Sequence, residues 1–167
     1  MSLPVDVKFD IMKEDWNVYE LSDGTILRTK FVLIKVARGV DASGNIGYNF
    51  NSTNHVAAFT PNDKKGTPST IRYSPNELQS SIVEDVDFDA KKENWNVYDL
   101  EDKSRISVKL ILTRVAKTDK CDPAGSPIYL TQTQTVIKPK LAKEFQKKVI
   151  STMRSKGPKS KTTSYQV

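Results

Sequence analysis

The sequence predicts a mainly β protein that arose by tandem duplication of one small unit, a β-barrel or β-roll. Three observations support this prediction: a repeated sequence, segments in which apolar and polar residues alternate, and turn-forming residues between those segments. A short helix that connects the two copies and a C-terminal amphipathic helix complete the expected architecture.

The repeat is centred on the sequence Trp-Asn-Val-Tyr, which occurs at Trp16–Tyr19 and again 79 positions later at Trp95–Tyr98. At the same offset the chain also repeats Val7, Phe9, Asp10, Glu14, Leu21, Asp23, Lys30, Leu33, Val36 and Ala37. Beyond these positions the offset drifts slightly, as expected when surface loops differ in length. We therefore predict a first β-rich unit over 1–80, a second over 81–154 with the C-terminal helix, and a basic, disordered tail over 155–167.

The first strands of each unit follow from local patterns. Residues 5–10 alternate apolar and polar side chains, residues 16–21 form an aromatic-rich strand, and residues 25–37 form a long strand. Asp23-Gly24 predicts a tight hairpin turn before the long strand, because glycine accepts positive φ without strain. The second copy has Lys103 at the place of Gly24, so we expect there either another turn type or modest strain.

The long strand and the end of each copy supply the predicted core and the helices. Phe31 and Leu33, with Leu110 and Leu112 in the second copy, occupy the face that we expect to be buried. The sequence from Ser74 to Glu77 is typical of a helix capping box and predicts a short connecting helix. Apolar residues recur every four positions between residues 139 and 154, which predicts the C-terminal amphipathic helix.

The composition is that of a globular protein, with 37% hydrophobic and 28% charged residues. No apolar run approaches the roughly 18 residues that cross a bilayer, so we expect no membrane insertion. The single cysteine, Cys121, excludes an internal disulfide and is compatible with the reducing cytoplasm, where we expect the protein. One cysteine and one histidine, His55, cannot form a Cys/His zinc cluster, so no metal or cofactor is predicted.

The positive charge is concentrated at the C-terminal end. Of the 26 Lys+Arg and 20 Asp+Glu in the chain, residues 138–167 hold nine basic residues and one acidic residue, a net charge of +8, which leaves −2 for residues 1–137. Lys147, Lys148, Arg154 and Lys156 are therefore candidates for contacts with an anionic partner such as nucleic acid. Lysine predominates, so such contacts would be nonspecific. Alternatively, the helix packs on the second unit and only the tail is solvated.

The sequence favours a protein without enzymatic activity. A nucleophile needs a positioned base, but His55 is alone and has no counterpart in the second copy. The chain also lacks a Walker loop, a dinucleotide-binding fingerprint and a nucleophile elbow. Two carboxylate pairs, Asp10 with Glu14 and Asp89 with Glu93, have spacing that can bind a hard cation, but neighbouring lysines would neutralise them.

The two Trp-Asn-Val-Tyr segments have two interpretations. They can form stacking platforms for bases or sugars, or they can pack in the core or between the units. The acidic body favours packing, with Trp16 and Trp95 mostly buried in equivalent sites.

The predicted function is a binding or scaffolding protein that presents two pseudo-equivalent β surfaces to a protein partner or to a second copy of itself. The alternative is nonspecific nucleic-acid binding through the C-terminal helix and tail. The candidate binding residues are Trp16, Tyr19, Trp95, Tyr98, Lys147, Lys148, Arg154 and Lys156.

Overall fold

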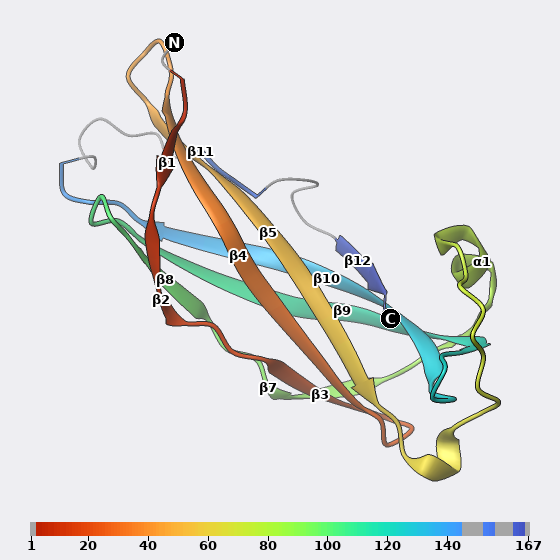
Figure 1. Ribbon diagram of the computed structural model, residues 1–167. Coiled ribbons are helices and arrows are strands. Elements are labelled where there is room, and N and C mark those ends of the chain that lie inside the picture. The colour runs from red at the N-terminus through yellow and green to blue at the C-terminus, as the bar shows by residue number, and fades with distance from the viewer. Residues whose placement is uncertain (1–2, 145–151, 156–161, 166–167) are drawn as a thin grey trace.

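The computed structural model describes residues 3–144, 152–155 and 162–165, and it confirms a mainly β chain (Figure 1). The strands are β1 (Val5–Val7), β2 (Phe9–Lys13), β3 (Asn17–Leu21), β4 (Ile26–Val40), β5 (Ile46–Phe59), β6 (Ile82–Asp85), β7 (Phe88–Lys92), β8 (Asn96–Leu100), β9 (Arg105–Cys121), β10 (Pro127–Lys140), β11 (Thr152–Ser155) and β12 (Thr162–Tyr165). A 3-10 turn, η1 (Asn62–Lys64), and one helix, α1 (Pro75–Ser80), lie between β5 and β6. Within the described ranges, no helix has the length and apolar character needed to span a membrane.

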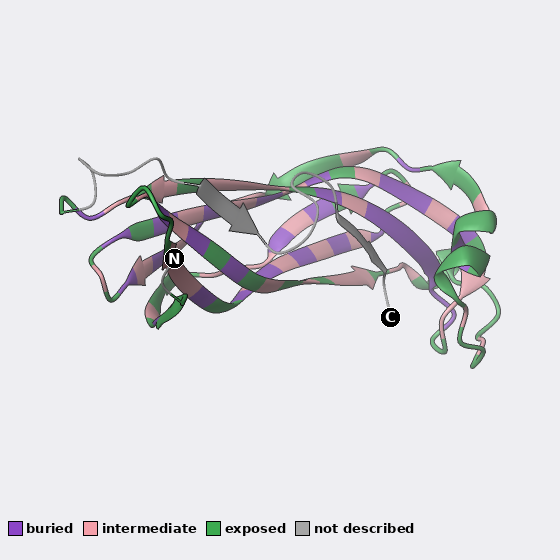
Figure 2. Cartoon of the chain, turned by 90° about the horizontal axis from the view of Figure 1, so that it is seen from above, coloured by how far each residue is buried: buried purple, intermediate pink, exposed green. Residues whose placement is uncertain are grey.

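The strands form two six-stranded sheets that pack face to face, with the buried residues between them (Figure 2). The first sheet has the order β11-β5-β4-β3-β7, and β1 also pairs with β4. The second sheet has the order β12-β10-β9-β8-β2, and β6 also pairs with β9. Within residues 3–144, each sheet therefore contains strands of its own copy and one edge strand of the other copy, β7 in the first sheet and β2 in the second. The C-terminal strands β11 and β12 form the opposite edges.

The backbone pairing follows the same pattern in the two sheets. In the first sheet Asp6 lies opposite Ala37, and in the second sheet their equivalents, Asp85 and Ala116, lie opposite each other. Both long hairpins also carry an irregularity at the same place, where Ile34 in β4 and Thr113 in β9 have no partner across the ladder. Such bulges are specific local features, so their repetition shows that both copies fold in the same register.

The two copies exchange strands. β2 pairs with β8 of the second copy, and β7 pairs with β3 of the first copy, in equivalent antiparallel registers. Two backbone hydrogen bonds also cross in an equivalent way, from the Ser22 N–H to the Asp87 carbonyl at 2.8 Å and from the Glu101 N–H to the Lys8 carbonyl at 2.9 Å. The expectation of two barrels side by side is therefore wrong: the described sheets are open, and the copies interlock. The boundary expected at residues 80 and 81 separates the copies along the chain but does not separate the sheets.

The two larger core clusters contain residues of both copies. One joins Phe31, Leu33, Val36 and Tyr48 to Tyr98, Leu100, Ile106, Val108 and Leu110, and the second joins Tyr19, Leu21 and Leu27 to Val86, Leu112, Val115 and Tyr129. A smaller third cluster packs Leu78 of α1 on Ala116, Ile128 and Leu130. The predicted burial of Phe31, Leu33, Leu110 and Leu112 is confirmed. Because each cluster needs both copies, neither copy can bury its own apolar face alone.

The connecting helix is confirmed and has the predicted cap. The Ser74 side chain accepts a hydrogen bond from the Glu77 N–H, and Pro75 occupies the start of α1. The Ser74 hydroxyl also donates to the Glu77 carboxylate at 3.2 Å, which is a side-chain bond in place of the backbone bond from the Ser74 N–H that a full capping box contains.

The predicted C-terminal helix is wrong at both of its ends. β10 continues through Pro139 to Lys140 because it pairs with β9 along its whole length, and β11 is a strand that pairs in parallel with Gly47–Phe50 of β5. The tail predicted to be disordered contains β12, which pairs with Leu130–Thr133 of β10. Residues 145–151, the middle of the expected helix, lie outside the described residues. Strand pairing satisfies the hydrogen-bonding groups of the backbone at the sheet edges. The apolar residues at every fourth position gave no information about this pairing, because it depends on distant strands.

The hairpin turn of the second copy keeps the same turn conformation as the first and is strained, which is one of the two outcomes expected for Lys103. Lys103 has a φ of 68°, and its equivalent Gly24 has a φ of 87°. Lys103 therefore adopts the same left-handed conformation as the glycine, at a cost of roughly 1–2 kcal/mol for a residue with a side chain. The pairing of the strands that this turn joins therefore determines the conformation of the turn more strongly than the local preference of lysine does.

Candidate functional site

The two tryptophans occupy equivalent positions on the outer faces of the two sheets. Side chains alternate along a strand, and Asn17, Tyr19 and Leu21 are buried, so Trp16 lies on the opposite, outer side of its strand. Trp95 has the same relation to Asn96 and Tyr98 in the second sheet. Both tryptophans are partly buried, which agrees with the predicted equivalent and mostly covered sites, but neither belongs to the buried core.

A basic side chain lies over each tryptophan ring. The Lys30 Nζ is 5.7 Å from the centroid of Trp16, and the Nζ of its equivalent, Lys109, is 5.8 Å from the centroid of Trp95. The ladder explains this placement, since Asn17 pairs with Thr29 and Asn96 pairs with Val108, so the next outward residues meet across the strands. Each sheet thus presents a tryptophan and a lysine together at the same register.

The tryptophan face of the first sheet has an additional arginine and phenylalanine. The Arg28 Cζ lies 4.7 Å from the centroid of Trp16 and 6.0 Å from that of Phe59, whose side chain is 55% exposed. Neither Arg28 nor Lys30 forms an ion pair with a carboxylate among the described residues. We define the first tryptophan face as Trp16, Arg28, Lys30 and Phe59.

The second tryptophan face, Trp95 with Lys109, differs in charge. The Lys109 Nζ lies 3.9 Å from the Glu93 carboxylate, so its charge is partly compensated. The residue equivalent to Arg28 is Ser107. Phe59 pairs with Ile26, and the equivalent of Ile26, Arg105, pairs with Lys140, so Lys140 takes the place of Phe59. The two faces share a tryptophan and a lysine, but only the first carries two uncompensated cations beside two aromatic rings.

Tyr19 and Tyr98 are fully buried and are used to join the copies. The Tyr19 hydroxyl donates to Glu93 at 2.5 Å, and the Tyr98 hydroxyl donates to Glu14 at 2.7 Å. Burial, together with the neighbouring carboxylate, raises the pKa of both tyrosines well above the usual value. Both rings are 0% exposed, so no ligand can stack on them and these two residues do not line a binding surface.

A second pair of buried tyrosines makes equivalent bonds. Tyr48 donates to Asp102 at 2.6 Å, and Tyr129 donates to Asp23. Burial and the bond to Asp102 raise the pKa of Tyr48 to about 12. Burial by itself would raise the pKa of Asp102, but the hydrogen bonds from Tyr48, Ser104 and other donors outweigh that effect and hold this pKa below its usual value. All four tyrosine–carboxylate bonds connect one copy to the other.

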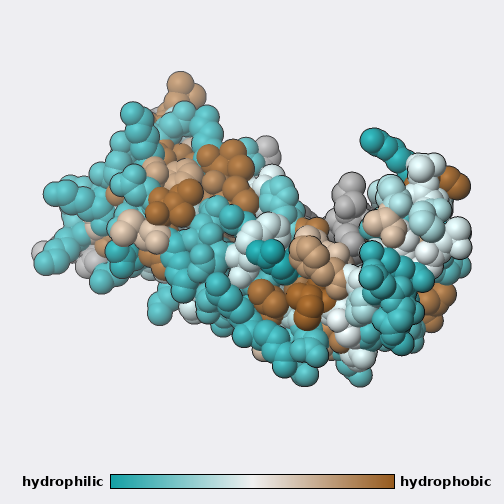
Figure 3. All heavy atoms as spheres, turned by 60° about the horizontal axis from the view of Figure 1, so that its bottom comes forward, coloured by the Kyte–Doolittle hydropathy of each residue, from teal (hydrophilic) through white to brown (hydrophobic). Residues whose placement is uncertain are grey.

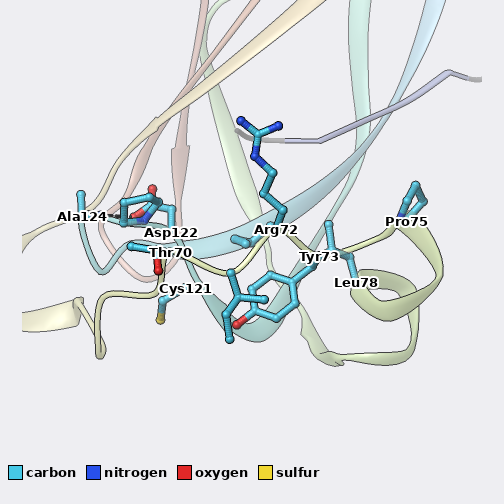
Figure 4. A pocket seen from close by; sticks show the side chains of 11 residues that line it. Thr70, Arg72, Tyr73, Pro75, Leu78, Cys121, Asp122 and Ala124 are labelled. Atoms are coloured by element: carbon cyan, nitrogen blue, oxygen red, sulfur yellow. Dashed lines mark hydrogen bonds between the residues drawn. The ribbon is translucent and has the colours of Figure 1, made fainter.

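A groove with a volume of about 800 Å³ lies between residues 70–78 and the turn between β9 and β10 (Figure 4). Its wall includes Ile71, Arg72, Tyr73, Leu78, Cys121 and Ile128. The preceding connector is held to the turn by the Gly66 N–H, which donates to the Gly125 carbonyl at 2.8 Å. A Cβ on Gly125 would lie 2.7 Å from the Gly66 carbonyl oxygen, so this approach requires glycine. The sequence of this connector is not repeated in the second copy, and sequence patterns gave no signal for the groove.

The remaining predicted site residues are not brought together with the tryptophans. Lys147, Lys148 and Lys156 lie outside the described residues. Arg154 lies in β11, at the edge of the first sheet, and its side chain is not described. His55 is exposed and lies opposite Lys30 on β5, where its Nε2 is 3.1 Å from the Thr53 hydroxyl.

The carboxylate pairs do not form a metal site in the described part of the chain, where no three Asp, Glu, His or Cys side chains are grouped to hold an ion. Glu14 and Glu93 each accept a hydrogen bond from a buried tyrosine, and Asp10 and Asp89 are exposed. On the view in Figure 3 the apolar surface is divided into patches separated by hydrophilic residues. Comparison with protein-family models, with curated proteins and with solved structures gave no match to this chain.

Proposed function

We propose that this chain is a non-enzymatic, bivalent binding module and that each of its two tryptophan faces binds an anionic partner. The observation that supports this proposal is the repetition of the pairs Trp16–Lys30 and Trp95–Lys109 at one register on the outer faces of both sheets. A tryptophan offers a large contact area and a lysine offers complementary charge, a combination suited to anionic ligands.

The arrangement of the sheets favours two separate contacts. The sheets pack with their inner faces together (Figure 2), so the outer faces point in opposite directions. One small ligand cannot reach both faces, whereas two partners can bind at once, as can two segments of one long polymer. In the polymer case, binding at one face raises the effective concentration of the ligand at the other.

The test uses the two tryptophans as reporters, since the chain contains no others. The variants Trp16→Phe and Trp95→Phe each leave one emitting tryptophan, and each is titrated with heparin, a polyanion. We expect the emission to change in both variants. Lys30→Ala should weaken the response of Trp16 alone, and Lys109→Ala should weaken the response of Trp95 alone.

A further variant separates this proposal from binding through the C-terminal region. It replaces Lys147, Lys148, Arg154 and Lys156 with Gln and keeps both faces intact. If heparin binding persists in this variant and both tryptophans still respond, the faces carry the function. If neither tryptophan responds in any variant while this one loses binding, the proposal is wrong and the C-terminal charges carry the affinity.

A further inference from the structure

The first tryptophan face has a feature that general anion binding does not require: a row of flat π surfaces crosses the sheet. Trp16 lies just before β3, Arg28 on β4 and Phe59 at the end of β5, and the guanidinium lies 4.7 Å from one ring centroid and 6.0 Å from the other. An arginine guanidinium stacks on nucleic-acid bases as well as on aromatic rings. Three neighbouring elements of one sheet thus present surfaces on which successive bases can stack.

Positive charge accompanies this row. The Lys30 Nζ lies 5.7 Å from the centroid of the Trp16 ring, and the Arg28 Cζ lies 4.7 Å from it. Neither Arg28 nor Lys30 is paired with a described carboxylate, so both can contact phosphates. The phosphate backbone of a ligand would therefore meet cations beside the stacking row.

We propose that the first tryptophan face is a binding site for single-stranded nucleic acid, an inference that rests on the proposed function and names its ligand. Bases stack on Phe59 and on the guanidinium of Arg28, which lies over the Trp16 ring, while Lys30 and Arg28 neutralise phosphates. Stacking requires unpaired bases, because the bases of a duplex are already stacked inside the helix. The recognition is tolerant of sequence, since every base has a π face and no rigid set of donors reads base edges.

The second face provides a natural control because it lacks this row. Ser107 stands at the place of Arg28, and Lys109 lies 3.9 Å from Glu93. The substitution Arg28→Ser therefore gives the first face the residue that the second face has at this position, while Trp16, Lys30 and Phe59 are kept. It changes a partly exposed residue of β4 and leaves the core intact.

The experiment measures the anisotropy of a labelled thymidine oligonucleotide of about twelve nucleotides, within the range of known single-strand sites. The proteins are the full chain and its variants Arg28→Ser, Trp16→Ala and Trp95→Ala, with thermal melting as the check of folding. We expect Arg28→Ser and Trp16→Ala to weaken binding by about tenfold, as for the loss of one stacked base, and Trp95→Ala to change it less than twofold. Because Arg28→Ser does not touch the core, it decides the outcome if Trp16→Ala fails to fold.

Emission from Trp16 in the Trp95→Phe background gives the second readout. Stacking should quench it with the oligonucleotide, and a duplex of the same length should bind more weakly and quench less. Equal binding of duplex and single strand, without quenching and without an effect of Arg28→Ser, overturns the inference. If Trp16 responds to heparin but not to the oligonucleotide, only the identity of the ligand is wrong. If Trp16 and Trp95 respond to neither probe, the proposed function fails as well.

Discussion

Replacing Tyr48 with phenylalanine should lower the free energy of unfolding by about 2 kcal/mol, within the range for hydrogen bonds to charged groups. The substitution removes only the hydroxyl, which donates to Asp102 at 2.6 Å across the two copies. The Asp102 side chain is 6% exposed, so water cannot readily replace the lost donor. Asp102 keeps Arg38 at 2.9 Å and the Ser104 N–H at 3.0 Å, and these contacts limit the loss.

The loss is measured by urea unfolding at neutral pH, where the midpoint should fall without a change in the slope. Tyr129→Phe is a matched variant, because Tyr129 donates to Asp23 at the equivalent place, and it should lose a similar amount. Tyr73→Phe is the control, since Tyr73 is only partly buried and bonds to the Ser69 hydroxyl at 3.1 Å. Its effect should stay within about 0.5 kcal/mol.

The effect of Tyr48→Phe on the free energy of unfolding should depend on pH in a direction that a loss of packing alone would not produce. The folded-state pKa of Asp102 lies below its usual value, so the stabilisation is present above the unfolded-state pKa of about 3.9 and is lost as the pH falls through the folded-state pKa. Without the Tyr48 hydroxyl the pKa of Asp102 is less depressed. The difference between the parent and Tyr48→Phe should therefore narrow in acid. A loss below about 0.5 kcal/mol at neutral pH, or a difference that does not depend on pH, would refute a role for this bond in joining the copies.

Three further predictions concern the turn, the tyrosines and the exchanged strands. Lys103→Gly should raise stability by about 1 kcal/mol, because the residue has a φ of 68°; an unchanged or lower melting temperature would contradict this strain. The folded-state pKa is raised for four buried tyrosines, Tyr19, Tyr48, Tyr98 and Tyr129. The stability that these shifts contribute is present below about pH 10 and is lost as the pH rises through the folded-state pKa values. An absorbance titration should therefore show these tyrosines ionising together with unfolding. Fragments 1–80 and 81–167 should not fold as separate monomers but should regain strand content by circular dichroism when mixed, because β2 and β7 complete the opposite sheets; a folded monomeric fragment would show that a copy is self-sufficient.

The sequence predicted much of the candidate site but not which residues face outward. Identical segments at Trp16 and Trp95 predicted two equivalent surfaces, and the structure places both tryptophans at the same register. Tyr19 belongs to the same segment, yet it is buried, since a strand alternates its faces and only the packing of the opposite sheet decides which face is inside. The contribution of Arg28 and Phe59 could not be predicted, because it depends on how three strands are aligned in one sheet.

The sequence by itself determined the repeat, because the same residues recur 79 positions apart. It also determined the strands of residues 5–37, the cap of α1 and the positions of the turns, because each of these depends on residues close together in the chain. Only the tertiary structure decided that the copies exchange strands. β2 and β7 are equivalent in sequence, and so are their partners β8 and β3, so pairing within a copy and pairing between copies satisfy the same local pattern. Pairing between the copies results from two crossings of the chain. β1 pairs with β4 in the first sheet, and after the single residue Lys8 the chain continues as β2 in the second sheet. In the same way β6 pairs with β9 in the second sheet, and the chain then continues as β7 in the first sheet. These crossings depend on the packing of two sheets around a shared core, which no local pattern contains.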